Sequence, residues 1–412
     1  MCRSHRTALF LSALVTLAGP VLSAQASEKR NPSPLAAPTK ASLGAAAEAR
    51  LVAIYRLIGN SQARQALPLA EQLVKDHPDF QLAQLTYGDL LLAQTRTIRL
   101  PGDLGEAGGF ESATADLAGL RQEAIQRLRA RAQRPPPGTV PSQFLALSAN
   151  SKHAIAVDAS RSRLYLFKNS PLGLQLVEDF YVSVGSSGIF KQIEGDARTP
   201  LGVYFITSTL DPTSLPDFYG SGALPLNYPN PLDLKRGKSG SGIWLHGTPP
   251  GQFARAPMAT EGCLALSNPD LEQLIRTVAV RSTPVVIAHS LTWVAPQSLR
   301  GDSQHFEAAL QNWRQAKSSG NMSALDAFYA PDFTSRGRTR SDWMRSTQVE
   351  VQRLRGREIE LKDVSYLRWT DSADTMVVTF GELIRGDRSG RTKRQYWIRQ
   401  NDQWKIFFEG LI

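Results

Sequence analysis

Cysteine is scarce in this chain of 412 residues, which contains only Cys2 and Cys263. Two cysteines cannot form a disulfide framework or supply the ligands of a cysteine-rich zinc site. The sequence also lacks a glycine-rich phosphate-binding loop and a stripe of interleaved basic and aromatic residues. These absences argue against nucleotide-dependent and nucleic-acid-binding proteins. We therefore expect no nucleic acid, metal or other cofactor to bind.

The N-terminus carries an apolar run at residues 8–22, which is too short to cross a membrane. Arg3 and Arg6 precede the run, and the small-x-small sequence AQA follows it at residues 24–26. This order is typical of a secretory signal peptide. We predict a signal peptide at residues 1–26, export to the periplasm or cell-wall space, and no membrane span after its removal. A short N-terminal membrane anchor is the alternative.

Positive charge exceeds negative charge, with a formal net charge of +10. For an exported protein, the anionic partners that such a charge favours are the cell wall and membrane surfaces. If Cys2 leaves with the signal peptide, Cys263 is an unpaired thiol in a compartment that tends to oxidise thiols. An exported protein that keeps one thiol suggests a chemical role for it.

Periodicity and composition predict a multidomain protein with a helical, a mostly β and an α+β part. The predicted segments are a flexible lead-in at 27–48, a helical domain at 49–134, a proline-rich linker at 135–143, a mostly β domain at 144–292, and an α+β domain at 300–412. The helical domain resembles a single tetratricopeptide unit, and a plain helical domain is an equal alternative. One such unit cannot bury its own apolar face, so neighbouring helices or a second subunit must cover it.

Tryptophan is concentrated in the last segment. Five of the seven tryptophans lie there: Trp313, Trp343, Trp369, Trp397 and Trp404. Such aromatic residues usually fill a core, and a binding pocket is the second interpretation.

A thiol nucleophile needs a base, a group that orients the base, and donors for the developing oxyanion. The chain has six histidines, of which three lie in the predicted β domain: His153, His246 and His289. His246 ends the apolar strand-like run GIWLH and precedes a glycine turn. A strand end followed by a loop is where a rigid scaffold presents catalytic groups. A packed structural histidine is the alternative at each position.

Three segments in this order, TPLGVY, IWLHGT and TEGCLAL, resemble the YkuD-type L,D-transpeptidase catalytic domain. The resemblance covers about a third of the chain. It implies that Cys263 is the nucleophile and His246 the base. It further implies that the carbonyl of Gly247 orients the imidazole and that the amides of Gly262 and Cys263 form an oxyanion hole.

Two positions depart from the pattern of this family. Glu261 replaces its usual histidine before Gly-Cys, and Ala265 replaces its usual Arg or Asn. A carboxylate beside the thiol opposes thiolate formation unless a cation such as Arg255 neutralises it. A degenerate, inactive site is one interpretation. In the active interpretation we expect Glu261, Trp244 and Arg255 to bind substrate.

The three-part layout offers another explanation for the departures. A helical domain, a YkuD-type domain with [ST]EGC and a C-terminal nuclear-transport-factor-2-like domain resemble the L,D-carboxypeptidases that set helical cell shape in some bacteria. That resemblance implies a homodimer formed through the N-terminal helices and a ligand-binding pocket in the C-terminal domain.

The resemblance implies that peptidoglycan stem peptides are the substrate. We expect an L,D-transpeptidase that releases D-alanine from a stem tetrapeptide and forms a 3–3 cross-link. The first alternative is an L,D-carboxypeptidase that transfers the acyl group to water. The second is a non-catalytic scaffold that binds the cell wall.

Overall fold

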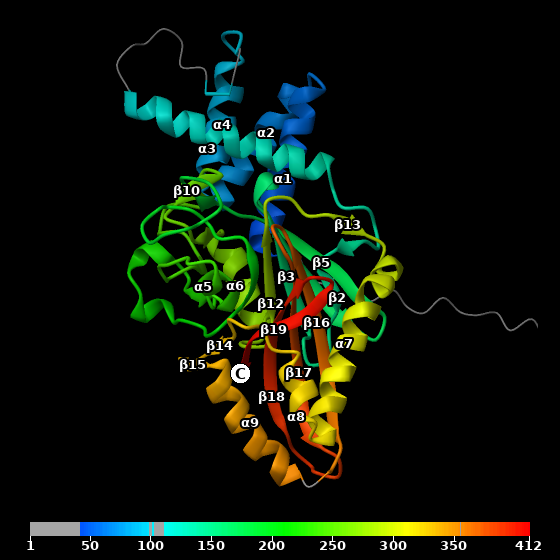
Figure 1. Ribbon diagram of the computed structural model, residues 1–412. Helices are drawn as coiled ribbons and strands as arrows, with labels where there is room; N and C mark the ends of the chain where they lie inside the picture. Colours follow the sequence, from blue (N-terminus) through cyan, green and yellow to red (C-terminus); the bar gives the residue numbers. More distant parts are fainter. Residues whose placement is uncertain (1–41, 99–100, 103–110, 355) are drawn as a thin grey trace, which may run out of the picture. The chain divides into compact units, whose positions relative to one another are not determined.

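The computed structural model describes residues 42–98, 101–102, 111–354 and 356–412 (Figure 1). The predicted signal peptide and most of the predicted lead-in lie outside the described residues. Within the described ranges, no helix is both long and apolar enough to cross a membrane. A helical, a β-rich and an α+β part follow one another in the predicted order.

The helical part contains four helices among the described residues. They are α1 (Leu43–Gly59), α2 (Ala63–Asp76), α3 (Gln81–Leu92) and α4 (Glu111–Ala132). Residues 43–48, predicted as a flexible lead-in, are helical instead. The Ser42 side chain caps α1 by accepting a hydrogen bond from Ala45 N, and the alanine-rich sequence that follows favours a helix.

The apolar face of the helical part is covered by the β-rich part. Leu51 and Ile54 of α1 and Phe80 share one buried core with Tyr181 and Phe253 of the β-rich part. The neighbour that a single tetratricopeptide-like unit requires is therefore present within the same chain.

Two sheets form most of the β-rich part. The larger has the order β5-β4-β3-β12-β7, and the smaller has the order β11-β9-β8. Their strands are β3 (His153–Asp158), β4 (Arg163–Ser170), β5 (Gly173–Tyr181), β7 (Gly202–Phe205), β8 (Ala223–Pro225), β9 (Trp244–His246), β11 (Leu264–Ala265) and β12 (Pro284–Ala288). This part also contains the short helix α5 (Pro231–Lys235) and the longer helix α6 (Asn268–Thr277).

The α+β part places helices before an antiparallel sheet, as its sequence predicts. The helices are α7 (Leu299–Ser319), α8 (Met322–Asp326) and α9 (Arg340–Leu354), and the strands are β16 (Ile359–Thr370), β17 (Asp374–Ile384), β18 (Arg391–Gln400) and β19 (Gln403–Leu411). Trp313 and Trp397 are fully buried in its core.

The domain boundary predicted at residue 144 is wrong, because the residues that follow it belong to the C-terminal sheet. Strand β2 (Phe144–Ala146) pairs with β16 and extends the C-terminal sheet to β19-β18-β17-β16-β2. The predicted linker also contains a strand, β1 (Val140–Pro141), which pairs with β13 (Trp293–Val294). Strands of two or three residues have no periodicity of their own, so their distant partners cannot be inferred from local sequence.

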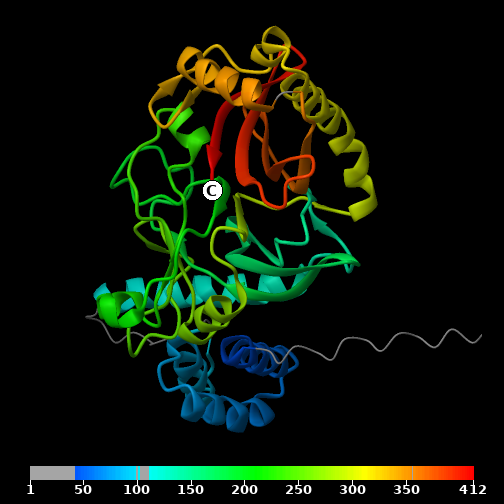
Figure 2. The ribbon, with the colours of Figure 1, turned by 90° about the horizontal axis from the view of Figure 1, so that it is seen from below.

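The β-rich and α+β parts share a hydrophobic core. Strand β3 alternates between two cores, because Ile155 and Val157 face one and Ala154 and Ala156 face the other. The second core also contains Leu367 of β16 and other residues of the C-terminal sheet. The C-terminal sheet and the β-rich part therefore bury one another's apolar surface (Figures 1 and 2).

Candidate active site

Two neighbouring strands carry the predicted nucleophile and base. Strands β9 and β11 are parallel, with Leu245 opposite Leu264 and His246 opposite Ala265. Leu245 and Leu264 are both fully buried in the core. Because side chains alternate along a strand, His246 and Cys263 project from the opposite face. The sheet thus brings to one face two residues that lie far apart in sequence.

The His246 imidazole is buried and held by its own turn. Its Nδ1 lies 2.7 Å from the carbonyl oxygen of Gly247. A carbonyl only accepts, so Nδ1 carries the proton and Nε2 is left as the basic atom. Burial lowers the pKa of His246 to about 4; the Gly247 hydrogen bond opposes this shift and the Arg255 charge adds to it. At neutral pH the ring is therefore an uncharged base.

The turn after His246 is fixed by Asn268, at the start of α6. Its Oδ1 accepts from Thr248 N at 3.2 Å and from Ser221 N at 2.9 Å. Its Nδ2 donates to Thr248 O at 2.8 Å. A Cβ on Gly247 would lie 2.1 Å from Asn268 Oδ1, so the close approach requires glycine there. The helix cap itself is Ser267, whose side chain accepts from Asp270 N.

The thiol of Cys263 is protonated at rest. Its Sγ donates to the carbonyl of Gly242 at 3.3 Å. Burial raises the pKa of Cys263 above 9.0; the backbone N–H of Trp244 lowers it, Glu261 raises it, and Arg255 and Lys191 lower it. Glu261 and Arg255 therefore shift the pKa of Cys263 in opposite directions, as predicted, but burial has the largest effect on that pKa. A neutral thiol next to a neutral base indicates proton transfer during attack rather than a resting ion pair.

The amide of Gly262 already has a partner. It donates to Thr260 Oγ1 at 3.1 Å, and that hydroxyl donates to Cys263 O at 2.7 Å. The carbonyl of Gly262 accepts from Thr199 Oγ1 at 3.0 Å. In this geometry the hydroxyl of a threonine two residues earlier accepts from the Gly262 N–H, and the oxyanion role predicted for that amide stays a prediction. The role predicted for the Cys263 amide stays a prediction.

Aromatic side chains line the site beside the imidazole. Tyr219, on the short 3-10 helix η3 (Asp217–Tyr219), lies 5.2 Å from His246 and 5.0 Å from Trp244 between ring centroids. Phe218 lies 5.9 Å from His246. The carbonyl of Tyr219 accepts from Gly247 N at 3.0 Å. The sequence gave no indication of Phe218 or Tyr219, which sit in a proline-rich loop without a recognisable motif.

The residues predicted to bind substrate lie around this pair. Trp244 packs against Tyr219, and the Arg255 guanidinium lies 4.2 Å from the ring centroid of Phe218. Glu261 is exposed and acts electrostatically on both Cys263 and Tyr219. Their roles in binding stay predictions.

The other two histidines of the β-rich part belong to the larger sheet. His153 begins β3 opposite Lys168, and His289 follows β12. Neither is on the small sheet that carries Cys263. No cluster of three or more metal-ligating side chains occurs within the part of the chain that the structure describes.

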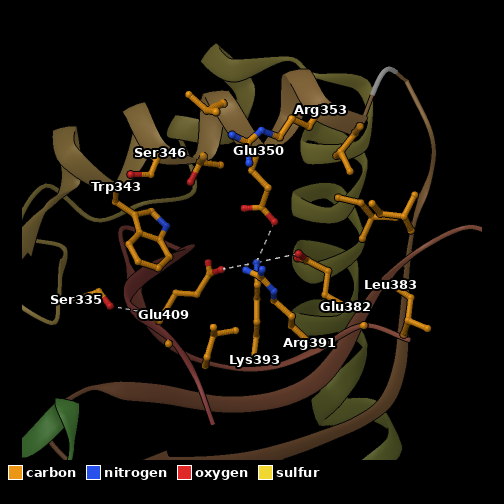
Figure 3. Close-up of a pocket in the computed structure, with 18 of the residues that line it drawn as sticks. Ser335, Trp343, Ser346, Glu350, Arg353, Glu382, Leu383, Arg391, Lys393 and Glu409 are labelled. Atoms are coloured by element: carbon orange, nitrogen blue, oxygen red, sulfur yellow. Dashed lines mark hydrogen bonds and ion pairs between the residues drawn. The ribbon is translucent and has the colours of Figure 1, made fainter. Parts of the chain in front are cut away.

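The α+β part contains a separate cavity of about 860 Å³. Figure 3 shows Lys393 at its centre, where Nζ pairs with Glu382 at 2.8 Å, Glu409 at 3.3 Å and Glu350 at 3.7 Å. Trp343 lines the same cavity, and its buried Nε1 has no hydrogen-bond partner. Of the five tryptophans, Trp343 thus lies at a cavity, whereas Trp313 and Trp397 fill the core.

Comparison with known protein families matches two parts of the chain. Residues 152–287 match YkuD, the L,D-transpeptidase catalytic domain, and residues 305–410 match the Cds6 C-terminal NTF2-like domain. These matches confirm the predicted resemblance and the multidomain fold class. No curated protein matches the chain at a significant level.

Two solved structures share the fold over most of their length. Bd1075 of Bdellovibrio bacteriovorus is 23% identical with a TM-score of 0.56, over 66% of this chain and 98% of its own. The helical cell shape determining protein Pgp2 of Campylobacter jejuni is 21% identical with a TM-score of 0.52, over 65% of this chain and 95% of its own. This chain therefore joins a segment that matches the YkuD L,D-transpeptidase catalytic domain to one that matches the Cds6 C-terminal NTF2-like domain.

Proposed function

We propose that this protein is an exported, peptidoglycan-modifying cysteine enzyme that opens the bond after the third residue of a stem tetrapeptide. The observation that carries the proposal is the state of His246. Its Nδ1 is hydrogen-bonded to the carbonyl of Gly247, which leaves Nε2 to accept a proton. Strand β9, which ends at His246, pairs with β11, which begins directly after Cys263. The match of this segment to the L,D-transpeptidase catalytic domain supplies the substrate class.

In the first half-reaction Cys263 Sγ attacks the carbonyl carbon of the third residue while His246 Nε2 takes the thiol proton. A sulfur–carbon bond forms, and the bond from that carbon to the nitrogen of D-alanine breaks. His246 returns the proton to the leaving nitrogen, so D-alanine departs as a neutral amine and a thioester remains on Cys263. The neutral imidazole and the neutral thiol both suit this sequence of proton transfers.

In the second half-reaction the acyl group passes from the thioester to water or to an amine, and the Cys263 thiol is released. Transfer to water gives a tripeptide and makes the protein an L,D-carboxypeptidase; transfer to a side-chain amine of another stem gives a 3–3 cross-link and makes it an L,D-transpeptidase. The three-part layout, whose fold is shared with a helical cell shape determining protein, supports water as the acyl acceptor. The match to the L,D-transpeptidase catalytic domain supports an amine as the acceptor.

Product analysis separates these outcomes. The protein is incubated with a disaccharide-tetrapeptide, and the products are weighed by mass spectrometry, with Cys263→Ala as the control. Loss of alanine alone indicates hydrolysis, and appearance of dimers indicates cross-linking. No change with the wild-type protein would support the scaffold hypothesis and contradict the proposal.

We further propose that Glu261 pairs with the ammonium group of the diamino acid at the third position. Glu261 is exposed next to Cys263, so its carboxylate faces solvent where a substrate side chain arrives. Replacing Glu261 by Gln should raise KM several-fold for a tetrapeptide with a free side-chain amine. An unchanged KM would contradict this role.

The proposal also includes export of the protein and its assembly into a homodimer. Export rests on the leader predicted at residues 1–26, and N-terminal sequencing of the secreted protein tests it. A homodimer formed through the N-terminal helices is tested by the mass of the protein in solution.

A further inference from the structure

Arg255 lies beside the catalytic pair, on the loop that joins β9 to β10 (Met258–Thr260). Its guanidinium carbon is 4.2 Å from the ring centroid of Phe218, which itself lies 5.9 Å from the His246 ring. The charge of Arg255 lowers the pKa of both His246 and Cys263. The guanidinium is therefore within electrostatic reach of both reacting groups.

This arginine has unused hydrogen-bonding capacity. Its Nε is buried and has no acceptor, and its Nη1 donates to Ala259 O at a long 3.4 Å. No carboxylate of the described residues forms an ion pair with it, and none contributes to its pKa shift. A guanidinium has five donors in a planar fork, so most of its donors are left for another acceptor.

Two buried arginines, Arg127 and Arg163, have carboxylate partners. Arg163 Nη1 donates to Glu48 Oε2 at 2.8 Å, and Arg127 Nε donates to Glu123 Oε1 at 2.8 Å. A third, Arg394, donates instead to Thr379 Oγ1 at 2.9 Å and to a backbone carbonyl at 3.3 Å. Arg255 differs from the two paired arginines, and a buried donor without an acceptor has a free-energy cost that a ligand can remove.

Arg255 also borders open space. A cavity of about 490 Å³ lies between α4 and the loop that carries Arg255. Among the described lining residues Arg255 is the only basic one. Of the two acidic side chains there, Glu123 is engaged by Arg127 and Asp116 is exposed to solvent. Alanines at 254, 256 and 259 leave room next to the guanidinium.

We propose that Arg255 binds the terminal carboxylate of the stem tetrapeptide and thereby restricts the enzyme to peptides whose fourth residue ends in a free carboxylate. This inference rests on the proposed function, because it assigns a partner to one end of that substrate. The carboxylate is one residue away from the scissile carbonyl, so a cation beside Cys263 is suitably placed. A planar guanidinium suits a carboxylate better than any other side chain does.

The test is a cycle of two proteins and two substrates. Wild-type protein and Arg255→Gln are each assayed for D-alanine or D-alaninamide release from the tetrapeptide and its C-terminal amide. In the wild type, amidation should lower kcat/KM on the order of 10- to 100-fold, as expected for loss of a charge-assisted bidentate contact. In Arg255→Gln the acid and the amide should react at similar, reduced rates. Arg276→Gln removes the same charge from an exposed position on α6 and should behave as wild type.

If Arg255 acts only on the thiol, amidation of the substrate and the Arg255→Gln substitution lower kcat/KM by independent factors. Arg255→Gln then still discriminates against the amide. That result would overturn the inference. Arg255→Lys keeps the charge without the planar fork and should restore only part of the discrimination.

Binding separates this inference from the proposed function. The affinities of acid and amide for Cys263→Ala and for Cys263→Ala with Arg255→Gln are measured by calorimetry. Discrimination in the first protein and its loss in the second support the carboxylate contact even if the wild type releases no D-alanine, in which case the proposed function alone fails. Equal affinities of acid and amide for Cys263→Ala would contradict the inference.

Discussion

His246 and Cys263 lie on one face of the small sheet as two uncharged groups. Burial is the main cause in both cases, because a buried side chain loses the solvation of its charged form. A thiolate–imidazolium pair would need a base whose pKa exceeds that of the thiol, and here the order is reversed. We therefore expect activation of the thiol by proton transfer to Nε2 as the sulfur attacks.

This arrangement predicts how the free thiol titrates. The rate of Cys263 alkylation by iodoacetamide should rise continuously with pH up to and beyond 9.0, the ordinary pKa of the thiol, because only the thiolate reacts. The rate is measured by intact-protein mass. A plateau between about pH 6 and 8 would reveal a preformed ion pair and contradict the account.

At this scale the sequence indicated the proposed nucleophile and base but not the residues that hold them. Cys263 and His246 could be singled out because thiols and histidines are few and because the motifs around them are recognisable. Asn268 and Tyr219 act through contacts that depend on how distant loops meet, which no local pattern records. The hydrogen bond from the Gly262 amide to Thr260 likewise has no local sequence signature, and the oxyanion role of that amide stays a prediction.

Helix α1 is attached to the catalytic part by a buried ionic cluster. Glu48 accepts from Arg163 of β4 and pairs with Arg127 of α4 at 3.0 Å. Burial raises the pKa of Glu48, but the two arginines outweigh it and lower that pKa to about 2. The cluster therefore links the first helix, the fourth helix and the larger sheet.

Replacing Glu48 by Gln should lower the free energy of unfolding by about 1–3 kcal/mol, because Arg127 and Arg163 lose their shared buried partner and keep only Glu123 and Asp179. Chemical denaturation measures the change. The matched control, Asp76→Asn, breaks the exposed pair with Arg50 and should leave the midpoint almost unchanged. A small effect of Glu48→Gln would show that the helical part is attached by apolar contacts alone.

The same cluster has a pH dependence with a definite sign. The pKa of Glu48 in the folded protein lies below its ordinary value of 4.5, so its contribution to stability is present above pH 4.5. That contribution is lost as the pH falls from 4.5 towards 2, where the folded carboxylate takes up a proton.

Long helices and strands repeat a pattern that local sequence can show, whereas short ones do not. Helices such as α4 and strands such as β16 carry many periods of their pattern, whereas α5, β1 and β2 carry at most two. The positions of β1 and β2 follow from their partners, β13 and β16, which lie far away in sequence.

The β-rich and α+β parts form one packed body because they share a hydrophobic core. Leu367 of β16 is 1% exposed and packs in the same cluster as Phe167 and Val286 of the larger sheet. Sequence periodicity indicated two domains but gave no sign that the faces of their sheets meet. Such packing depends on which face of each sheet is left uncovered.

Replacing Leu367 by Ala should therefore destabilise both parts together, by about 2–5 kcal/mol, within one cooperative transition. Calorimetry and tryptophan fluorescence together follow the transition. Leu172→Ala is the control, since this leucine is 86% exposed and its loss should change stability by less than about 0.5 kcal/mol. Two separate transitions in Leu367→Ala would mean that the two parts fold independently.

The most direct test of the central claim is the release of D-alanine from a disaccharide-tetrapeptide by the whole protein. The account predicts release by the wild type, none by Cys263→Ala, and a loss of at least about 100-fold in His246→Ala, whose base is missing. Release that persists in Cys263→Ala, or no release by a folded wild-type protein, would contradict it.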